Sequence, residues 1–478
     1  MRTFGNLLAF SPELWLLAGA IVIFLLARLR TGAPTTTVAV VTLVAAFLAL
    51  ATQFKQTITI LDGAFILDGF AIVIDVVVLA AAVLTLLAGR ADILPGDGEA
   101  GALPGFFLLA TLGAMLAASA AEMVSLFLAL ELLAINLYVL SVLARRGLAP
   151  ATAGLGYLTA GAASSALLLY GLALVFGLTG ETRLGATGTA MAALGPNEPA
   201  VLLALSLILG GFALRMGLLP VRWWPRGFES GVPLRVVIFV QSAGVVVAFA
   251  VFGRLAASTF ASSRIPYAAV IAGVAALAMT GGNLLALMQT SVRRLLVYST
   301  IAQGGFALAA FTDLKGLGLS ALLVFLVGLV LGNICAFAAV IAYARSVHSD
   351  AVRDLAGMSR SAPGLAFALA VALVSLIGLP PVAGFFGKVL VLQSVVNSGY
   401  AWLAVLAVAN IAFAAFGYLR VLRIIFVDPP VFEVAPARLD RGIQVAVVLA
   451  SVGLVFMGLL LGPLYAAASY GRAALLLH

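Results

Sequence analysis

The sequence predicts an all-α polytopic membrane protein with about fourteen transmembrane helices. Of its 478 residues, 64% are hydrophobic and only 9% are charged, whereas a soluble protein carries about 25% charged residues. The 49 glycines fit the high glycine content of transmembrane helices. Apolar runs of about 20 residues, the length that crosses a bilayer, recur along the whole chain.

Each predicted span is an apolar run that ends at polar or helix-breaking residues. The runs lie at about 12–29, 36–54, 66–89, 103–120, 123–144, 151–178, 200–219, 232–256, 266–288, 293–312, 317–344, 362–397, 400–425 and 442–468. The junctions near 121 and 290 are short, so thirteen or fifteen spans remain open. No cleavable signal peptide is expected, because the first run ends at Arg28 rather than at small residues.

The basic residues predict the orientation of the chain in the membrane. Of the 26 Lys and Arg residues, 17 fall in odd-numbered loops and 7 in even-numbered loops and termini, while Arg215 and Lys388 lie inside spans. Because Lys and Arg are enriched in cytoplasmic loops, the odd loops are predicted to be cytoplasmic and both termini to lie outside.

The composition excludes several kinds of site. Cys335 is the only cysteine, and the two histidines, His348 and His478, are too far apart for a metal site. The net charge of +8 is scattered, which argues against nucleic-acid binding. We therefore expect no metal or cofactor in this chain and a lipid bilayer around it.

Ionisable side chains inside spans are the first candidates for function, since they are costly there and usually mark an ion path or a buried pair. Glu131, Arg215 and Lys388 are such residues. Lys388 is one of 3 lysines beside 23 arginines, and a buried ammonium can release its proton whereas a guanidinium cannot. Lys388 is thus predicted to be a proton relay. Glu131 and Arg215 are predicted to lie on the proton path as well, as a persistent buried pair between the fifth and seventh helices in which Arg215 is a fixed charge. Asp68 and Asp75 are weaker candidates near a helix end.

Helix breakers lie beside both intramembrane bases. Pro220 follows Arg215, while Pro380 and Pro381 precede Lys388. Breakers inside a span free backbone groups that must be satisfied in the protein interior or around a water-filled cavity. Two interrupted helices that lie five apart are typical of inverted-repeat transporters, so we expect helices 7 and 12 to be broken. The predicted divisions are residues 1–102 with helices 1–3, residues 103–260 as the first repeat (helices 4–8), residues 261–427 as the second (helices 9–13), and residues 428–478 with a loop and helix 14.

Several stretches of the chain have the character of family motifs: SLFLALELL at 125–133, SSALLLYG at 164–171, GNLLAL at 282–287, RLLVYSTIA at 294–302 and GLPPVAGFFGK at 378–388. In their order and spacing they resemble motifs of the antiporter-like subunits of respiratory complex I, most closely those of subunit N. The resemblance implies fourteen helices, a central line of charged residues, and proton translocation driven by electron transfer elsewhere in the complex. It also implies a bacterial inner membrane, with other antiporter-like and small membrane-arm subunits as partners.

The resemblance covers some site positions and not others. Glu131 and Lys388 match the family's fifth-helix glutamate and twelfth-helix lysine. Arg215 stands where the family has its seventh-helix lysine, and Val245 stands where an eighth-helix lysine is expected. Since neither Arg215 nor Val245 exchanges a proton near neutral pH, these replacements predict a modified N-terminal half-channel.

A second polar path is predicted in the C-terminal half, at Tyr298, Ser299 and Gln303. Gln303 occupies a position that is commonly histidine in the family. We expect a hydrated path around Lys388 and an interruption near Val245. Two other functions stay open: a membrane subunit of a cation/proton antiporter or membrane-bound hydrogenase, and a non-conducting structural subunit of the membrane arm.

Overall fold

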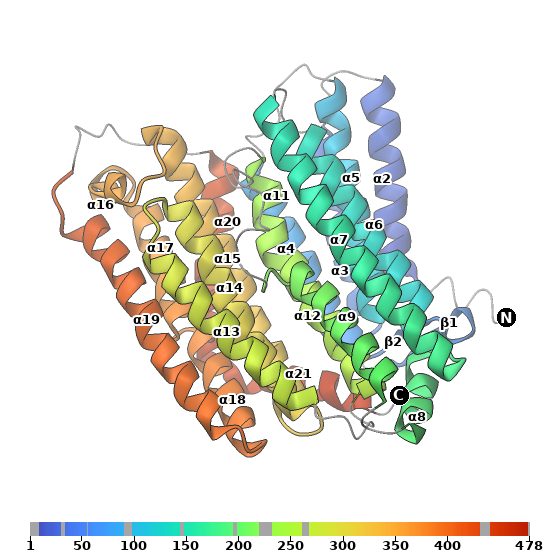
Figure 1. The fold of residues 1–478 in the computed structure, drawn as a ribbon. Coiled ribbons are helices and arrows are strands. Elements are labelled where there is room, and N and C mark those ends of the chain that lie inside the picture. Colours follow the sequence, from blue (N-terminus) through green and yellow to red (C-terminus); the bar gives the residue numbers. More distant parts are fainter. Residues whose placement is uncertain are drawn as a thin grey trace.

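The computed structural model describes residues 9–29, 34–54, 56–89, 98–143, 148–194, 198–218, 232–260, 267–430 and 440–476. In Figure 1, the helices of the second predicted repeat form one flank of a helical bundle, and those of the N-terminal part form the other. Helices α11 (Leu234–Phe239) and α12 (Val245–Leu255) lie between the two flanks. The contact between the halves therefore includes the predicted eighth span.

The first three spans form a group with a small hairpin. Its elements are α2 (Ser11–Leu29), α3 (Thr35–Ala51), β1 (Ile58–Ile60), η1 (Leu61–Gly63), β2 (Phe65–Leu67) and α4 (Gly69–Ala88). The antiparallel pairing of β1 with β2 was not predicted. The alternating Ile58-Thr59-Ile60 and the Asp62-Gly63 turn carry its signal. Helix α4 begins where Asp68 caps it, with the carboxylate accepting a hydrogen bond from the backbone N–H of Ala71 at 2.8 Å.

Five spans follow in the first predicted repeat. Its elements are α5 (Gly98–Ser119), α6 (Met123–Leu143), α7 (Leu148–Thr179), the short α8 (Leu184–Ala193), α9 (Pro199–Arg215), α11 (Leu234–Phe239), η3 (Val240–Gly244), α12 (Val245–Leu255) and η4 (Ala256–Phe260). The eighth span is one continuous rod from α11 to η4, but η3 and η4 are π-helical. Such wide turns are rare and occur frequently at functional sites.

The second predicted repeat has the same order of spans. Its elements are α13 (Tyr267–Leu287), α14 (Val292–Ala309), η5 (Ala310–Asp313), α15 (Gly318–Val347), η6 (Val352–Leu355), α16 (Met358–Ser361), α17 (Pro363–Ile377), α18 (Ala383–Asn397) and α19 (Ala401–Phe426). Helices α17 and α18 are the two halves of the predicted twelfth span, separated at Gly378–Val382. The predicted break at Pro380 and Pro381 is confirmed.

Equivalent helices of the two sets pack in equivalent ways. Helix α5 packs on α6 as α13 packs on α14, and α7 packs on α9 as α15 packs on α17 and α18. A Cβ atom on Gly113 would lie 2.5 Å from the backbone nitrogen of Leu133, and one on Gly282 would lie 2.5 Å from that of Ala302. Small residues that let helix backbones approach are typical of packing in membranes.

The C-terminal span differs from its prediction. The run at 442–468 is not one helix but two, α20 (Arg441–Leu459) and α21 (Leu461–Leu476). Pro463 explains the break, because a proline lacks the N–H that would bond four residues back and its ring clashes with that turn. Helix α21 packs against α4 and α15 at the lower end of the bundle in Figure 1.

The described helices agree with a polytopic membrane protein. Eleven of them are long and apolar enough to cross a membrane, and four more are apolar helices of 10–17 residues: α3, α9, α17 and α18. The total is fourteen if α3, α9 and the α17–α18 pair each cross once, so the count of fourteen stays a prediction. The short junctions near 121 and 290 are real ends of helices, closed by the isolated bridges Glu122–Arg183 and Ser291–Ala351.

Candidate functional site

Glu131 and Arg215 form an ion pair between α6 and α9. Nη2 of Arg215 donates to Oε1 of Glu131 at 2.5 Å, and the two side chains are 12% (Arg215) and 23% (Glu131) exposed. The predicted pairing is therefore present. Ser165 on α7 joins both groups, since its hydroxyl donates to Glu131 at 2.6 Å and accepts from Arg215 at 2.8 Å. Three helices thus hold the guanidinium in one position.

The end of α9 places Arg215 in the interior. The helix ends at Arg215, and Gly217 then takes a left-handed conformation with φ of 71°, which favours glycine. The backbone N–H of Leu218 closes the turn on the carbonyl of Ala213 at 2.7 Å. Pro220, the predicted break, lies outside the described residues. Helix 7 therefore ends before the proline, directly after its charged residue.

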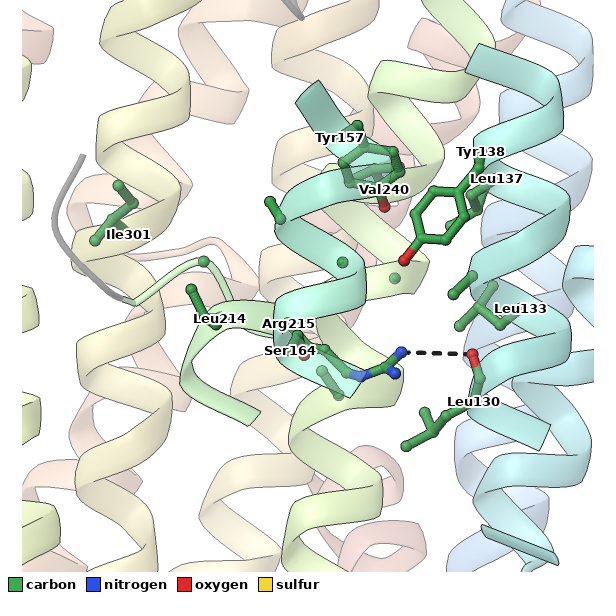
Figure 2. A pocket seen from close by; sticks show the side chains of 16 residues that line it. Leu130, Leu133, Leu137, Tyr138, Tyr157, Ser164, Leu214, Arg215, Val240 and Ile301 are labelled. Atoms are coloured by element: carbon green, nitrogen blue, oxygen red, sulfur yellow. Dashed lines mark hydrogen bonds between the residues drawn. The ribbon is translucent and has the colours of Figure 1, made fainter. Parts of the chain in front are cut away.

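A cavity of about 100 Å³ adjoins this pair. Figure 2 shows Arg215 at one end of it, with the hydrogen bond to the carbonyl of Leu130 dashed, and Tyr138 and Tyr157 further along. Its far wall is formed by Val240, Gly244, Ala248 and Ile301. The wall toward the second repeat is therefore apolar, whereas the wall at Arg215 is polar.

Lys388 lies in the second turn of α18 and is 2% exposed, and its ammonium reaches back to the break between α17 and α18. Its Nζ donates to the carbonyls of Leu376 and Ile377, at 2.7 and 3.1 Å, and lies 4.6 Å from the ring centroid of Phe306. Those carbonyls are in the last turn of α17, where carbonyls lack a partner within the helix. Within the described part of the chain, no carboxylate lies within 4.0 Å of this ammonium. Lys388 is thus held by neutral dipoles and a ring, not by a counter-ion.

One residue of the predicted secondary path, Gln303, shares a hydrogen-bond acceptor with Lys388. Nε2 of Gln303, on α14, donates to the carbonyl of Leu376 at 2.8 Å, the same oxygen that Lys388 uses. One turn earlier on α14, the hydroxyl of Ser299 hydrogen-bonds to that of Tyr418 on α19. Tyr298 lies half-buried on α14. The sequence did not single out Tyr418, which lies in a long apolar run two positions before Arg420.

Buried polar groups also connect the two halves. Nδ2 of Asn333, on α15, donates to the carbonyl of Gln241 at 2.5 Å and lies 3.5 Å from the hydroxyl of Thr300. Gln241 lies in the π-helical segment η3, one turn before Val245, which is the first residue of α12. Val245 is buried and offers no polar atom at this point. The described polar contacts therefore run from α14 through α15 to η3.

The comparisons with known proteins agree with this arrangement. Residues 120–414 match the family described as NADH:quinone oxidoreductase/Mrp antiporter, transmembrane. The chain is 34% identical over 420 residues, 88% of each protein, to NADH-quinone oxidoreductase subunit N of Moorella thermoacetica. The chain belongs to the NADH:quinone oxidoreductase/Mrp antiporter family. It is a multi-pass membrane protein of this family.

Solved structures show the same fold. A chain of respiratory complex I from Thermus thermophilus with bound aureothin superposes with a TM-score of 0.80 at 30% identity, covering 95% of this chain and 98% of that one. A chain of the Mrp complex from Dietzia sp. DQ12-45-1b gives a TM-score of 0.87 at 19% identity, covering 98% of this chain and 97% of that one. The Mrp likeness concerns the fold alone, whereas the sequence likeness is to NADH-quinone oxidoreductase subunits.

Within this family fold, the structure separates the predicted site residues into two clusters. Glu131 and Arg215 lie in the first repeat, and Lys388 with Gln303 lies in the second. Between them stand the apolar wall of the cavity and the polar contacts of Asn333 with η3. Ser165 lies in the motif at 164–171, but the sequence did not indicate its role. The sequence did not single out Asn333 either, although it is an amide inside an apolar run.

Proposed function

We propose that this chain is a proton-translocating, antiporter-like subunit of a redox-driven NADH:quinone oxidoreductase. The observation that carries the proposal is Lys388. It is buried beside a helix break and held by two carbonyls, with no counter-ion among the residues that the structure describes. An ammonium whose charge no partner fixes can release and regain a proton, as a relay requires.

The two clusters have different roles in this proposal. Lys388 exchanges protons, with the amide of Gln303 and the hydroxyls of Ser299 and Tyr418 guiding water toward it. Glu131 and Arg215 form a persistent ion pair, and its charges determine the electrostatic potential at the end of the cavity in the first repeat. Because Arg215 keeps its proton, the first repeat carries no titratable base at this position.

The remaining features of the proposal follow from the family and the charge pattern. Residues 103–260 and 261–427 are the two repeats, and both termini lie on the outer side of a bacterial inner membrane. The partners are the other membrane-arm subunits of the complex, which supply every redox cofactor. Identity of 30% to 34% with complex I proteins, against 19% with the Mrp chain, favours this function over a cation/proton antiporter.

Purification through a tag on this chain tests the assignment. We expect NADH-oxidising and quinone-reducing subunits to co-purify, as identified by mass spectrometry, and the complex to acidify proteoliposomes when NADH is added. Sodium/proton exchange without NADH oxidation, from a complex that lacks those subunits, would instead establish the antiporter function. A complex that pumps equally well after Lys388→Ala would leave this chain a structural subunit.

A double substitution tests the modified first repeat. Arg215→Lys with Val245→Lys restores the two titratable positions expected of the family. We expect more protons pumped per electron, because each added ammonium can exchange a proton where the present side chains cannot. The single variant Val245→Leu is the control for a change of size without charge. An unchanged ratio in an assembled double variant would contradict the idea that Val245 interrupts the path.

A further inference from the structure

A second group of buried acids lies outside the two clusters, among α2, α3, α4 and α5. Asp75 on α4 is 0% exposed, and Glu13 in the first turn of α2 is 6% exposed. Helices α2 and α4 both pack against α3 and α5. Within the described residues, neither carboxylate oxygen of Asp75 has a hydrogen-bond partner, and neither does Oε2 of Glu13.

The charges around Asp75 do not balance. The charged side chains that act on the Asp75 carboxylate are Glu13, Asp68 at the start of the same helix, and Arg254 on α12. Arg254 is already committed to Asp68, with Nη2 at 2.7 Å from the carboxylate and Nε on the carbonyl of Ala118 at 2.9 Å. Three carboxylates therefore share one guanidinium, which leaves two excess negative charges if all three are ionised.

The other elements packed on α4 bring few ionisable groups to this place. Helix α3 and residues 101–119 of α5 have none. Helix α21 brings Tyr470 against Gly69 and carries Arg472, which donates to the carbonyl of Gly316. Helix α11 brings Arg235 against Gly89, at the opposite end of α4. Helix α15 carries Arg345 in its last turn, and α20 begins at Arg441. Among the described residues, no Lys or Arg nitrogen lies within 4.0 Å of the Asp75 carboxylate.

We propose that Asp75 and Glu13 form a proton-binding carboxyl pair, separate from the line through Lys388. An unpaired ionised carboxylate in the protein interior is strongly unfavourable, and like charges in one buried region disfavour the ionisation of each other. A proton on each acid removes both costs and neutralises the cluster. Among the described residues, no three His, Cys, Asp or Glu side chains are close enough to hold a metal ion, which favours a proton over a multivalent cation.

A cavity lies near the start of α4, on the side of the β-hairpin. Its volume is about 270 Å³, and it is lined by Thr59, Gly63, Arg183, Ser258 and Arg254. It thus reaches the guanidinium that holds Asp68, seven positions before Asp75 on the chain. In the orientation proposed above this is the outer side, so the proposal places proton exchange by the pair on that side, while Arg254 keeps its own proton. The proposal goes beyond the proposed function and does not require that Lys388 is a relay.

Infrared spectroscopy of the purified complex tests the proposal without measuring pumping. We expect a C=O stretching band of a protonated carboxylic acid at neutral pH, with a shift in deuterium oxide. Asp75→Asn should remove this band, and Glu13→Gln should shift or weaken it. Asp428→Asn, a change at the far less buried acid after α19, is the control and should leave the band unchanged.

Two results would overturn the proposal. One is a spectrum of assembled Asp75→Asn that is identical to that of the unmodified complex. The other is a band that appears only when sodium is withdrawn, which would assign the pair to a monovalent cation. If Asp75→Asn does not assemble, Glu13→Gln decides the question, because its unchanged spectrum would equally exclude a shared site.

Discussion

Lys388→Ala should lower proton pumping several-fold while the complex still assembles and oxidises NADH. The change removes the ammonium at the break between α17 and α18 and replaces it with a side chain that binds no proton. Assembly should persist because Gln303 still donates to the carbonyl of Leu376, which leaves only the carbonyl of Ile377 without its partner. The measurement is acidification of proteoliposomes per NADH oxidised.

Lys315→Ala provides a matched control for this result. Lys315 is another of the three lysines, and it is exposed in the segment between η5 and α15. Its removal changes the charge of the chain by the same amount but touches no buried group. We expect normal pumping from this variant. Equal losses from both variants would point to net charge rather than to a relay at Lys388.

Glu131→Gln should destabilise the chain and its assembly. The substitution leaves Arg215 charged in a partly buried place, held only by Ser165 and neutral acceptors. Breaking a buried pair by removing one partner costs about 3–5 kcal/mol. Since the two side chains keep some exposure, we expect the lower end, about 3 kcal/mol. The measurement is the temperature at which this subunit leaves the purified complex.

A double variant separates pairing from the loss of either residue. Glu131→Leu with Arg215→Met removes both charges together and should recover most of the lost stability, because replacing a buried pair with apolar residues is often neutral. The exposed pair of Arg423 and Asp428 is the control, and Asp428→Asn should cost less than about 1 kcal/mol. A double variant as unstable as the sum of its singles would contradict a direct pair.

Much of this architecture could be predicted from the sequence because membrane spans leave a strong pattern. An ionisable residue in an apolar run is conspicuous, so Glu131, Arg215 and Lys388 stood out without any structure. Tandem prolines cannot continue a helix, and the break at 378–382 lies where Pro380 and Pro381 predict it. The pairing of Glu131 with Arg215 followed from the cost of leaving either charge alone.

Other features could not be read from the pattern, for physical reasons. The π-helical turns of η3 lie in an uninterrupted apolar run, and no residue type marks a wide turn. The contact of Ser299 with Tyr418 joins positions far apart in sequence, so only the packing of α14 on α19 brings them together. The sequence does not show how far Asp75 lies from the end of its helix, so it indicates only a weak candidate there. The complete burial of Asp75 in the structure is what marks it as unusual.

Proton pumping by the Lys388→Arg variant tests the central claim most directly. Arginine keeps the positive charge at the break in helix 12 but does not release its proton, so the variant separates charge from proton exchange. The measurement is the number of protons moved per electron in proteoliposomes that contain the assembled complex. We predict a loss as large as that of Lys388→Ala. A normal ratio from the arginine variant would contradict the claim that Lys388 relays protons and would leave it a fixed charge.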